Sequence, residues 1–321
     1  AEIADRVVVM SEGEIVEQGT ALEVYKNPQH PYTKRLIGAV PGMGEVHPDT
    51  LTTPPILSLR HVRKTYGAFT ALAGVSFDLR EGETLAIVGE SGSGKSTTAR
   101  LLLRLEDPSG GEAIYKGQDL FTMAPRDLLA MRRDIQMVFQ DPTQSLNPRM
   151  SVFQIVSEAW AIHAGIVPRA RWKDRVAQLL TEVGLSEDHM HRHPHQFSGG
   201  QRQRIAIARA LALEPRIIVC DEAVSALDVQ VQAQVIQLLD RLKAEHGLSY
   251  IFIAHDLPVV KDFADRVIVM QGGRIVEQGC VKQIFEAPRE AYTRNLLAAS
   301  LEPDPEVQAR RRAERLAMEV A

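Results

Sequence analysis

The sequence predicts an α/β fold with two additions, an antiparallel β subdomain and an inserted helical subdomain. Short apolar runs of strand length, at 83–88, 216–221 and 250–254, are each followed by a polar loop and a segment of helical period. This alternation of strand and helix is typical of an open α/β sheet. The runs 56–62 and 75–79 instead alternate apolar and polar residues, as half-buried antiparallel strands do.

The composition is that of an ordinary globular protein. The 321 residues, 45% of them hydrophobic, suffice for one large domain with additional segments or for two small domains. The formal net charge of −4 argues against nucleic-acid binding through electrostatic attraction alone. No apolar run approaches the roughly 18 residues that a membrane-spanning helix needs, and we expect no signal peptide. Cys220 and Cys280 are expected to be free thiols in a reducing cytosol, with Cys220 in a buried strand.

The segment 4–19 recurs as 264–279. Twelve of the 16 aligned positions are identical, without a gap, and weaker matches continue through Tyr32 and Tyr292. One copy near each end, with a whole domain between them, is not the contiguous pattern of a solenoid. We interpret the repeat as a tandem duplication of a large domain. Because the chain does not begin with Met, we expect a fragment that holds the end of the first copy and all of the second.

This interpretation divides the chain into four parts. Residues 1–40 are predicted to be the C-terminal remnant of a first domain. Residues 41–55 are rich in Pro, Gly and Thr and have no apolar period, so they are predicted to be a linker. Residues 56–300 are predicted to form the complete second copy, with its helical subdomain at about 142–196. A charged C-terminal tail is predicted for 301–321.

A glycine-rich segment joins the strand at 83–88 to a helix predicted at 97–105. It fits the pattern G-x-x-x-x-G-K-[ST] with the residues Gly89, Glu90, Ser91, Gly92, Ser93, Gly94, Lys95, Ser96 and Thr97. Between a strand and a helix, this pattern predicts a P-loop, whose backbone N–H groups and helix dipole attract phosphate. Lys95 is expected to reach the β- and γ-phosphates, and Ser96 to offer its hydroxyl to Mg²⁺.

Polar residues stand directly after three apolar runs, where open α/β sheets bind ligands. Gln140 is the first of them. Asp221 is placed to help hold Mg²⁺, and Glu222 to polarise a water for attack on a phosphorus atom. His255 can donate to a phosphate oxygen. Taken singly, the acids and the histidine could equally cap the helices that follow them.

Three other features each have two interpretations. Tyr66 precedes the P-loop strand and could stack on a purine, although strands favour tyrosine in any case. The histidines that alternate over 189–195 lack the i, i+4 spacing of a helical metal site, so an exposed loop is the better interpretation. The Ser-Gly-Gly at 198–200 precedes a helix predicted at 202–213, and is either a second phosphate site or a plain N-cap turn.

Taken in order, these landmarks resemble the nucleotide-binding domain of ABC transporters. They extend over residues 56 to about 300 and comprise Tyr66, the P-loop, Gln140, Phe197, Ser198, Gly199, Gly200, Gln201, Asp221, Glu222, Asp228 and His255. The resemblance implies a P-loop NTPase (ABC ATPase) core, with ATP and Mg²⁺ as cofactors.

The resemblance also implies a role for each landmark. Tyr66 would stack on adenine, and Lys95 with Ser96 and Thr97 would form the Walker A contacts. Gln140 would touch Mg²⁺ and relay the nucleotide state. Asp221 would be the Walker B acid, Glu222 would be the catalytic base, Asp228 would be the D-loop acid and His255 would be the switch histidine. Residues 198–201 resemble the signature motif, with Phe197 where leucine is more usual.

The segments 141–150, 193–197 and 30–33 are similar to oligopeptide, dipeptide and nickel importer ATPases. The duplicated layout resembles importers whose two ATPase domains share one polypeptide. The resemblance implies a peripheral ATP hydrolase on the cytoplasmic face of the inner membrane, which energises uptake of peptides or related small solutes. Its partners would be transmembrane permease subunits, a second ABC ATPase domain (a second copy of this chain or the first domain), and indirectly a solute-binding protein, with no nucleic acid.

The alternative class is a soluble ABC ATPase of translation or DNA repair. The repair type would need cysteines at zinc-binding spacing, and the chromosome-maintenance type a long coiled coil, and the sequence has neither. A structural half without hydrolysis is a further alternative, which the presence of Lys95, Asp221, Glu222 and His255 disfavours.

Overall fold

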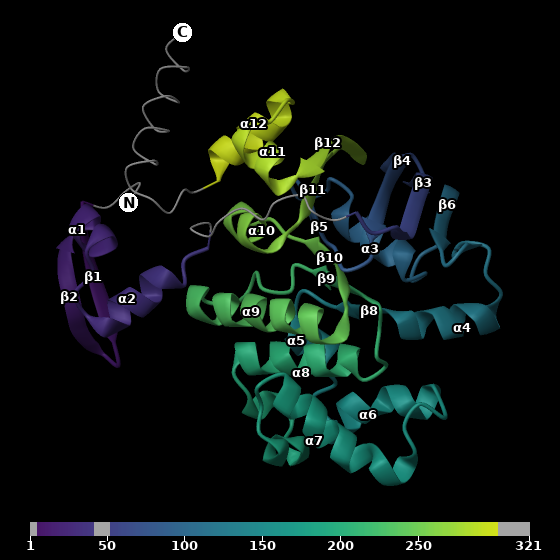
Figure 1. Cartoon of the computed structure of the whole chain (residues 1–321), viewed down its shortest axis with the longest axis horizontal. Helices are drawn as coiled ribbons and strands as arrows, with labels where there is room; N and C mark the ends of the chain where they lie inside the picture. The colour runs from purple at the N-terminus through teal and green to yellow at the C-terminus, as the bar shows by residue number, and fades with distance from the viewer. Residues whose placement is uncertain (1–4, 42–51, 301–321) are drawn as a thin grey trace.

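The centre of the computed structural model, which describes residues 5–41 and 52–300, is a six-stranded sheet of order β12-β11-β5-β10-β9-β8 (Figure 1). Neighbouring strands from β11 to β8 are parallel, and β12 is antiparallel to β11. The strands are β5 (Thr84–Val88), β8 (Ile135–Val138), β9 (Ile217–Asp221), β10 (Ser249–Ile253), β11 (Arg266–Gln271) and β12 (Arg274–Cys280). The predicted α/β fold is confirmed.

A second sheet, antiparallel throughout, has the order β4-β3-β6-β7. Its strands are β3 (Pro55–Tyr66), β4 (Phe69–Arg80), β6 (Gly110–Tyr115) and β7 (Gln118–Asp119). The strands predicted at 56–62 and 75–79 are longer than expected, because β3 continues past a register shift near His61, whose φ is +49°, as far as Tyr66. The hairpin turn therefore lies at Tyr66–Phe69.

Helices cover the central sheet and form a separate layer beyond it (Figure 1). Those around the sheet are α3 (Lys95–Leu102), α4 (Pro125–Asp134), α9 (Val229–His246), α10 (Leu257–Phe263), α11 (Val281–Glu286) and α12 (Ala291–Ala299). Those of the helical part are α5 (Pro142–Ser145), α6 (Val152–Ile162), η1 (Arg169–Arg171), α7 (Trp172–Glu182), η2 (Glu187–His191), η3 (Pro194–Gln196) and α8 (Gly199–Leu211). The histidine-rich run lies in the short 3-10 helices η2 and η3, where we expected an exposed loop.

The hydrophobic core has two parts, one on each face of the central sheet. Because side chains alternate along a strand, Leu85 and Ile87 of β5 face the antiparallel sheet, while Ala86 and Val88 face the helical part. Trp160 is 2% exposed, and its indole N–H donates to the Ala212 carbonyl at 2.7 Å. The helical part is therefore joined to the sheet by a continuous core.

The N-terminal unit repeats the last elements of the chain. Strands β1 (Arg6–Ser11) and β2 (Glu14–Thr20) with helices α1 (Ala21–Lys26) and α2 (Pro31–Gly38) follow the order of β11, β12, α11 and α12. Both strand pairs shift register at the same place, between Val9 and Met10 and between Val269 and Met270. Glu17 accepts from the backbone N–H groups of residues 29 and 30, and Glu277 from those of 289 and 290. The duplication seen in the sequence therefore extends to backbone geometry.

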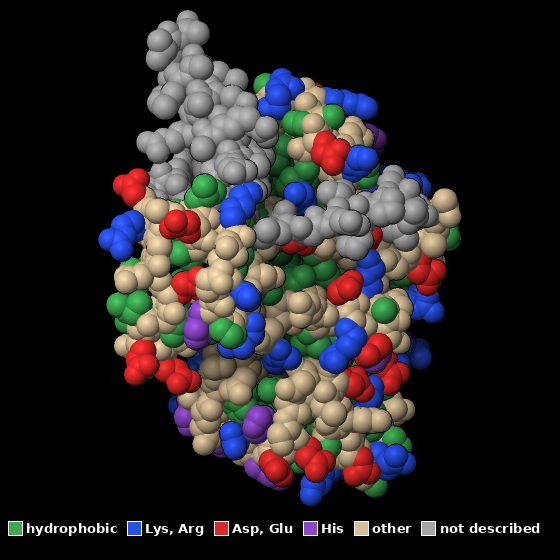
Figure 2. Space-filling view, turned by 60° about the vertical axis from the view of Figure 1, so that its left-hand side comes forward, with side chains coloured by type: hydrophobic (Ala, Val, Ile, Leu, Met, Phe, Trp, Pro, Cys, Tyr) green, Lys and Arg blue, Asp and Glu red, His purple; other side chains and the backbone are tan. Residues whose placement is uncertain are grey.

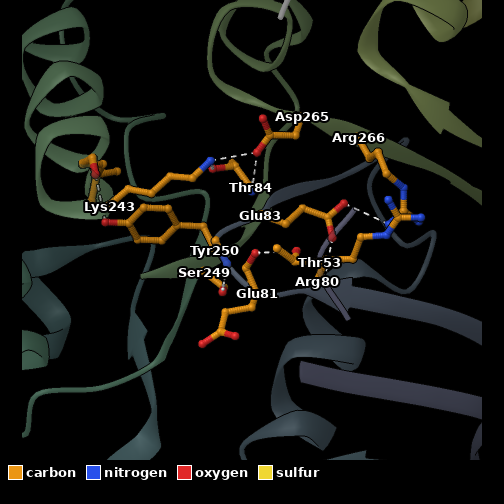
Figure 3. A network of polar contacts seen from close by, with 12 residues as sticks. Thr53, Arg80, Glu81, Glu83, Thr84, Lys243, Ser249, Tyr250, Asp265 and Arg266 are labelled. Carbon is orange, nitrogen blue, oxygen red and sulfur yellow. Dashed lines mark hydrogen bonds and ion pairs between the residues drawn. The ribbon is translucent and has the colours of Figure 1, made fainter. Parts of the chain in front are cut away.

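A polar network holds the amino ends of the central strands (Figure 3). The fully buried Glu83 accepts from Arg266 at 2.9 Å, and Asp265 accepts both from the Thr84 backbone N–H and from the Lys243 ammonium, each at 2.7 Å. Burial raises the pKa of Glu83, and the Arg266 guanidinium opposes this shift. The network joins α9 and β11 to the start of β5. The site described below lies at the opposite, carboxyl ends of the strands.

Over the described residues, the chain contains no helix of the length and apolar character required to cross a bilayer. Figure 2 shows acidic and basic side chains interspersed over the face that it presents. The surface pattern on this face agrees with the small net charge of −4.

Candidate functional site

The P-loop lies between β5 and α3, where the chain turns from the sheet into a helix. Gly94, with φ +107°, is the N-cap of α3, and Gly89 has φ +147°. A Cβ atom at Gly89 would lie 2.2 Å from the Met270 carbonyl oxygen of β11, and one at Gly94 would lie 2.7 Å from a Leu72 methyl group. These two glycines are therefore required both by conformation and by space.

Two side chains within the loop have the properties of anion ligands. Lys95 is 6% exposed, and its ammonium donates to the carbonyls of Gly89 and Glu90 at 2.8 and 2.9 Å. Burial lowers the pKa of Lys95, while Glu222 and Asp221 act in the opposite direction. Ser93 is 4% exposed, and its buried hydroxyl has no hydrogen-bond partner. A buried hydroxyl without a partner beside a buried cation fits a bound phosphate group.

Ser96 and Asp221 form the candidate metal position. The Ser96 hydroxyl donates to Asp221 Oδ1 at 3.1 Å, from the first turn of α3 to the end of β9. Burial raises the pKa of Asp221, and the Ser96 hydrogen bond opposes that shift. A hydroxyl and a carboxylate are oxygen ligands of the kind that Mg²⁺ prefers.

Glu222 lies between two other predicted site residues. The Gln140 amide donates to Glu222 Oε2 at 2.8 Å, and His255 Nδ1 lies 3.7 Å from the same oxygen. The Glu222 backbone has φ +48°, which is unusual for a residue other than glycine, and its N–H donates to the Ile253 carbonyl of β10. The backbone of β10 thus fixes the backbone of Glu222, and the Glu222 carboxylate lies between Gln140 and His255.

Tyr66 ends β3 and is 44% exposed. Its hydroxyl donates to the Glu106 carboxylate, and this hydrogen bond raises the pKa of the Tyr66 phenol. The Lys64 ammonium lies 4.7 Å from the centre of the Tyr66 ring. One face of the ring is therefore close to a cation.

The signature-like residues form a second group at the start of α8. Ser198 accepts from the Gln201 backbone N–H, and the Gln201 side chain accepts from the Ser198 N–H, which is a capping box. Gly200 faces α9, where a Cβ atom would lie 2.2 Å from a Val231 methyl group. Asp228, the N-cap of α9, accepts from the Val231 backbone N–H at 3.0 Å. Residues 198–201 and Asp228 are thus neighbours.

The structure therefore brings the predicted residues into two groups. The first contains the P-loop with Gln140, Asp221, Glu222 and His255, and the second contains 198–201 with Asp228. Among the described residues, no hydrogen bond joins the second group to the P-loop. A cavity of about 750 Å³ opens beside the first group, lined by Arg100, Phe139, Gln140, Asp141, Gln144, Ser145, Asp221, Ser225 and Ala226.

Sequence reasoning missed two contacts of predicted site residues, one at the P-loop and one at Tyr66. The Glu90 backbone N–H donates to the Tyr292 hydroxyl of α12 at 3.3 Å, and Glu106 holds Tyr66. Tyr292 had a sequence signal, since it aligns with Tyr32 in the internal repeat. Glu106 had none, because nothing in the spacing connects it with Tyr66.

Comparisons with known proteins agree with this geometry. Residues 72–225 match the ABC transporter family, and two segments, 16–58 and 276–320, match the oligopeptide/dipeptide transporter C-terminal region. The second family matches twice because its region is present in both copies of the repeat.

The glutathione import ATP-binding proteins GsiA of Escherichia coli (strain K12) and of Shigella dysenteriae serotype 1 are each 47% identical to the chain over 335 residues. These matches cover 93% of the chain and 54% of each relative, so the chain spans about half the length of the curated relatives it matches.

Solved structures match as well. A component of the ABC transporter complex cbiONQ from Clostridium perfringens has a TM-score of 0.66 and 30% identity, over 73% of this chain and 91% of that one. A dimeric ATP-binding cassette in a post-hydrolysis state, bound to ADP and Pi, has a TM-score of 0.63 and 31% identity, over 70% of this chain and 98% of that one.

The parallel sheet, the P-loop and the acids at the end of β9 define a P-loop NTPase. Within that class, the chain belongs to the ATP-binding cassettes of the ABC transporter family.

Proposed function

We propose that the chain binds ATP at residues 89–97 and hydrolyses it, to energise uptake of peptides or related small solutes. The observation that carries this proposal is the position of Glu222 beside the P-loop, with the Gln140 amide at 2.8 Å and His255 at 3.7 Å. The matched oligopeptide/dipeptide transporter region and the relatives named for glutathione import support a peptide-type solute.

Each residue of the first group has a task in this proposal. Lys95 would leave its two carbonyl partners and pair with phosphate oxygens, and the free Ser93 hydroxyl would donate to them. Glu222 would orient the attacking water and hold its proton, and His255 would donate to a γ-phosphate oxygen. These groups act by positioning and by neutralising charge, which are the main sources of catalysis in phosphoryl transfer.

The residues present also fit Mg²⁺. Ser96 Oγ and Asp221 Oδ1, 3.1 Å apart, and the amide oxygen of Gln140 would be its protein ligands. Bound Mg²⁺ would neutralise charge on the phosphate oxygens. Asp221 would then be held as a carboxylate in spite of its burial.

A second ABC ATPase domain would complete the site. The separation of residues 198–201 from the P-loop supports this, because the N-terminus of α8 and its capping Ser198 then remain available to another domain's nucleotide. The opposing domain is either a second copy of this chain or the first copy of the internal repeat.

We also propose the domain division of the sequence analysis for this chain. Residues 1–40 would be the end of a first ABC ATPase domain, 41–55 a linker, 56–300 a complete domain, and 301–321 a charged tail. The repeated strand pair, the shared register shift and the matching contacts of Glu17 and Glu277 support the first assignment. Residues 42–51 and 301–321 lie outside the described residues.

A groove beside the helical part supports contact with permease subunits. It has a volume of about 350 Å³ and its walls include Leu105, Leu129, Phe139 and Ile162, whose exposed fractions are 54%, 42%, 38% and 61%. Apolar side chains gathered in this way are typical of a protein contact. The chain would then act peripherally at the cytoplasmic face of the inner membrane, and a solute-binding protein would act through the permease. A soluble role in translation or repair is not favoured by the match to a transporter C-terminal region.

The test is Glu222→Gln in the full chain. We expect this change to lower ATP turnover by at least a hundredfold, because general-base catalysis contributes roughly 10²–10⁴-fold, and to leave ATP binding intact. Light scattering with ATP and Mg²⁺ then reports pairing. A dimer means that two copies pair symmetrically, and a monomer that still binds ATP means that the first domain supplies the opposing surface.

Lys95→Ala is the control for binding, and it should abolish ATP affinity together with any dimer. Turnover that persists in Glu222→Gln would exclude Glu222 as the base. ATP affinity that persists in Lys95→Ala would exclude the P-loop as the binding site.

A further inference from the structure

The Tyr66 ring is held on two sides by residues outside the recognised motifs. Lys64 and Tyr66 are two positions apart in β3, so their side chains project from the same face of the strand. The Lys64 ammonium lies 4.7 Å from the ring centre, within the range of a cation–π contact, and also donates to the Asp107 carbonyl at 2.6 Å. One face of the ring is thus closed by a cation that is itself fixed.

The ring is fixed a second time, through its hydroxyl. Tyr66 donates to Glu106, which also lies 3.7 Å from the Lys64 ammonium and 3.4 Å from an Arg100 nitrogen. Arg100 belongs to α3, and Glu106 follows shortly after that helix ends. Glu106 therefore connects the end of β3 to the helix whose first residue is Lys95.

This connection fixes the distance between the Tyr66 ring and the P-loop, which is the distance that a bound nucleotide would span between its base and its phosphates. The P-loop at the start of α3 would hold the phosphates, and an aromatic ring attached to α3 would lie at a constant separation from them. The structural unit that joins the two is the triad of Lys64, Tyr66 and Glu106, with Arg100 as a second cation at the carboxylate.

We propose that Glu106 is a positioning residue for the nucleotide base: it holds Tyr66 with one face closed by Lys64, so that the purine stacks on the opposite face. This inference rests on the proposed function, since it requires a nucleotide at the P-loop. The orientation is set before the base arrives, and the base therefore does not have to order the ring.

A purely structural role for Glu106 makes a different prediction. Its ion pairs lie near the surface, and such pairs contribute little to stability. In that case removal of the carboxylate would leave nucleotide affinity unchanged, or would weaken every ligand of the domain equally.

The experiment compares two ligands that share the phosphate chain and differ in the base. Calorimetry with Mg²⁺ would measure the dissociation constants of ATP and of inorganic tripolyphosphate for the full chain. In Glu106→Ala, we expect ATP to bind about three- to tenfold more weakly, a part of what base–aromatic stacking contributes, and tripolyphosphate to bind as before. Glu106→Gln should recover ATP affinity, because its amide oxygen still accepts from the Tyr66 hydroxyl.

Tyr66→Phe tests the same connection from the other side. It retains the ring and loses the hydrogen bond, so it should resemble Glu106→Ala. The double variant should bind ATP no more weakly than either single variant, because both substitutions remove the same Tyr66–Glu106 hydrogen bond.

The chain offers a control in a second triad of a lysine, a tyrosine and a carboxylate, in which an aspartate takes the place of the glutamate. The Lys116 ammonium lies 5.2 Å from the Tyr115 ring centre, and both side chains contact Asp134, at 2.6 and 3.0 Å. Asp134→Ala removes an equivalent carboxylate from β6 and α4, away from the P-loop. It should leave the ratio of ATP to tripolyphosphate affinity unchanged.

The proposal is overturned if Glu106→Ala leaves ATP affinity unchanged, or if it weakens ATP and tripolyphosphate by the same factor. Failure of the proposed function gives a different result, in which Lys95→Ala binds both ligands as tightly as the unmodified chain.

Discussion

Asp221 illustrates how a candidate site residue can oppose the stability of its own domain. Its carboxylate is 9% exposed, and burial raises its pKa above the ordinary value. The folded state therefore disfavours the charged form. The resulting loss of folding stability is absent when the pH is below the pKa of Asp221 in the unfolded chain. It grows as the pH rises toward the pKa of Asp221 in the folded chain, and it remains constant above that pKa.

We therefore expect Asp221→Asn to raise Tm at neutral pH in the absence of nucleotide and Mg²⁺. The amide has the same shape, its oxygen still accepts from Ser96, and it carries no charge to desolvate. Calorimetric melting from pH 3 to pH 8 would measure the difference, which should vanish at the acidic end. In the same variant, adding Mg²⁺ to the ATP-bound chain should no longer raise Tm further. A Tm lower than that of the unmodified chain across the whole range would contradict this account.

At the residue scale, sequence reasoning correctly predicted which residues lie close together where their place follows from a local pattern, and the roles of these residues stay predictions. Lys95 was predicted from its place in a loop pattern, and Asp221 and Glu222 from the end of an apolar strand. Glu106 and Tyr292 were missed because they reach the site only through tertiary structure, across separations of 40 and 202 residues. The positive φ of Glu222 was also beyond prediction, since it depends on the hydrogen bond to β10.

At the scale of elements, the close contact between α8 and α9 depends on Gly200, which has no side chain. Gly200 is buried against Val231, where an added Cβ atom would lie at 2.2 Å, far inside van der Waals contact. Gly199 differs, because its added Cβ atom would meet Leu227 at an ordinary 3.6 Å.

Gly200→Ala should lower the free energy of unfolding by about 1–3 kcal/mol, as overpacking generally does. Val231→Ala should restore most of that loss, because the nearest remaining atom would be the Val231 Cβ at 3.6 Å. Urea denaturation of the single and double variants measures both effects, with Gly199→Ala as the matched control. Equal stability of Gly199→Ala and Gly200→Ala would show that α8 moves away from α9 without cost.

Most elements of the fold were predictable, because apolar periodicity carries over directly into strands and helices. The strands β5, β9 and β10 and the helix α9 lie within a few residues of their predictions. The helix α4 was not predicted. Five of its ten residues are charged, namely Arg126, Asp127, Arg132, Arg133 and Asp134, and only Met131 is buried. The position of α4 depends on its packing against the sheet more than on the apolar periodicity of its own sequence.

At the scale of the whole molecule, the repeat predicts that one module can replace the other. In the C-terminal copy, Asp265 and Arg266 join the network of Figure 3, and the aligned residues of the first copy are Asp5 and Arg6. The module 5–38 should therefore be able to occupy the place of 265–298.

We expect the full chain with 265–298 replaced by the sequence of 5–38 to fold and to bind ATP. Its main loss should be at Val281, which is fully buried and becomes the smaller alanine of position 21, at a cost of about 2 kcal/mol. Restoring valine at that one position should recover most of the Tm. A chimaera that remains unfolded even with this valine would show that the two modules are not structurally equivalent.

The two cysteines of the chain differ in a way that makes it suitable for fluorescent labelling without mutagenesis. Cys220 lies on β9 with no exposed surface, and burial raises its pKa to about 12, whereas Cys280 is partly exposed at the start of α11. Since the thiolate is the reactive form, a maleimide dye would be attached at Cys280, once per chain. Energy transfer between donor-labelled and acceptor-labelled chains would then test in real time whether two copies associate when ATP is added.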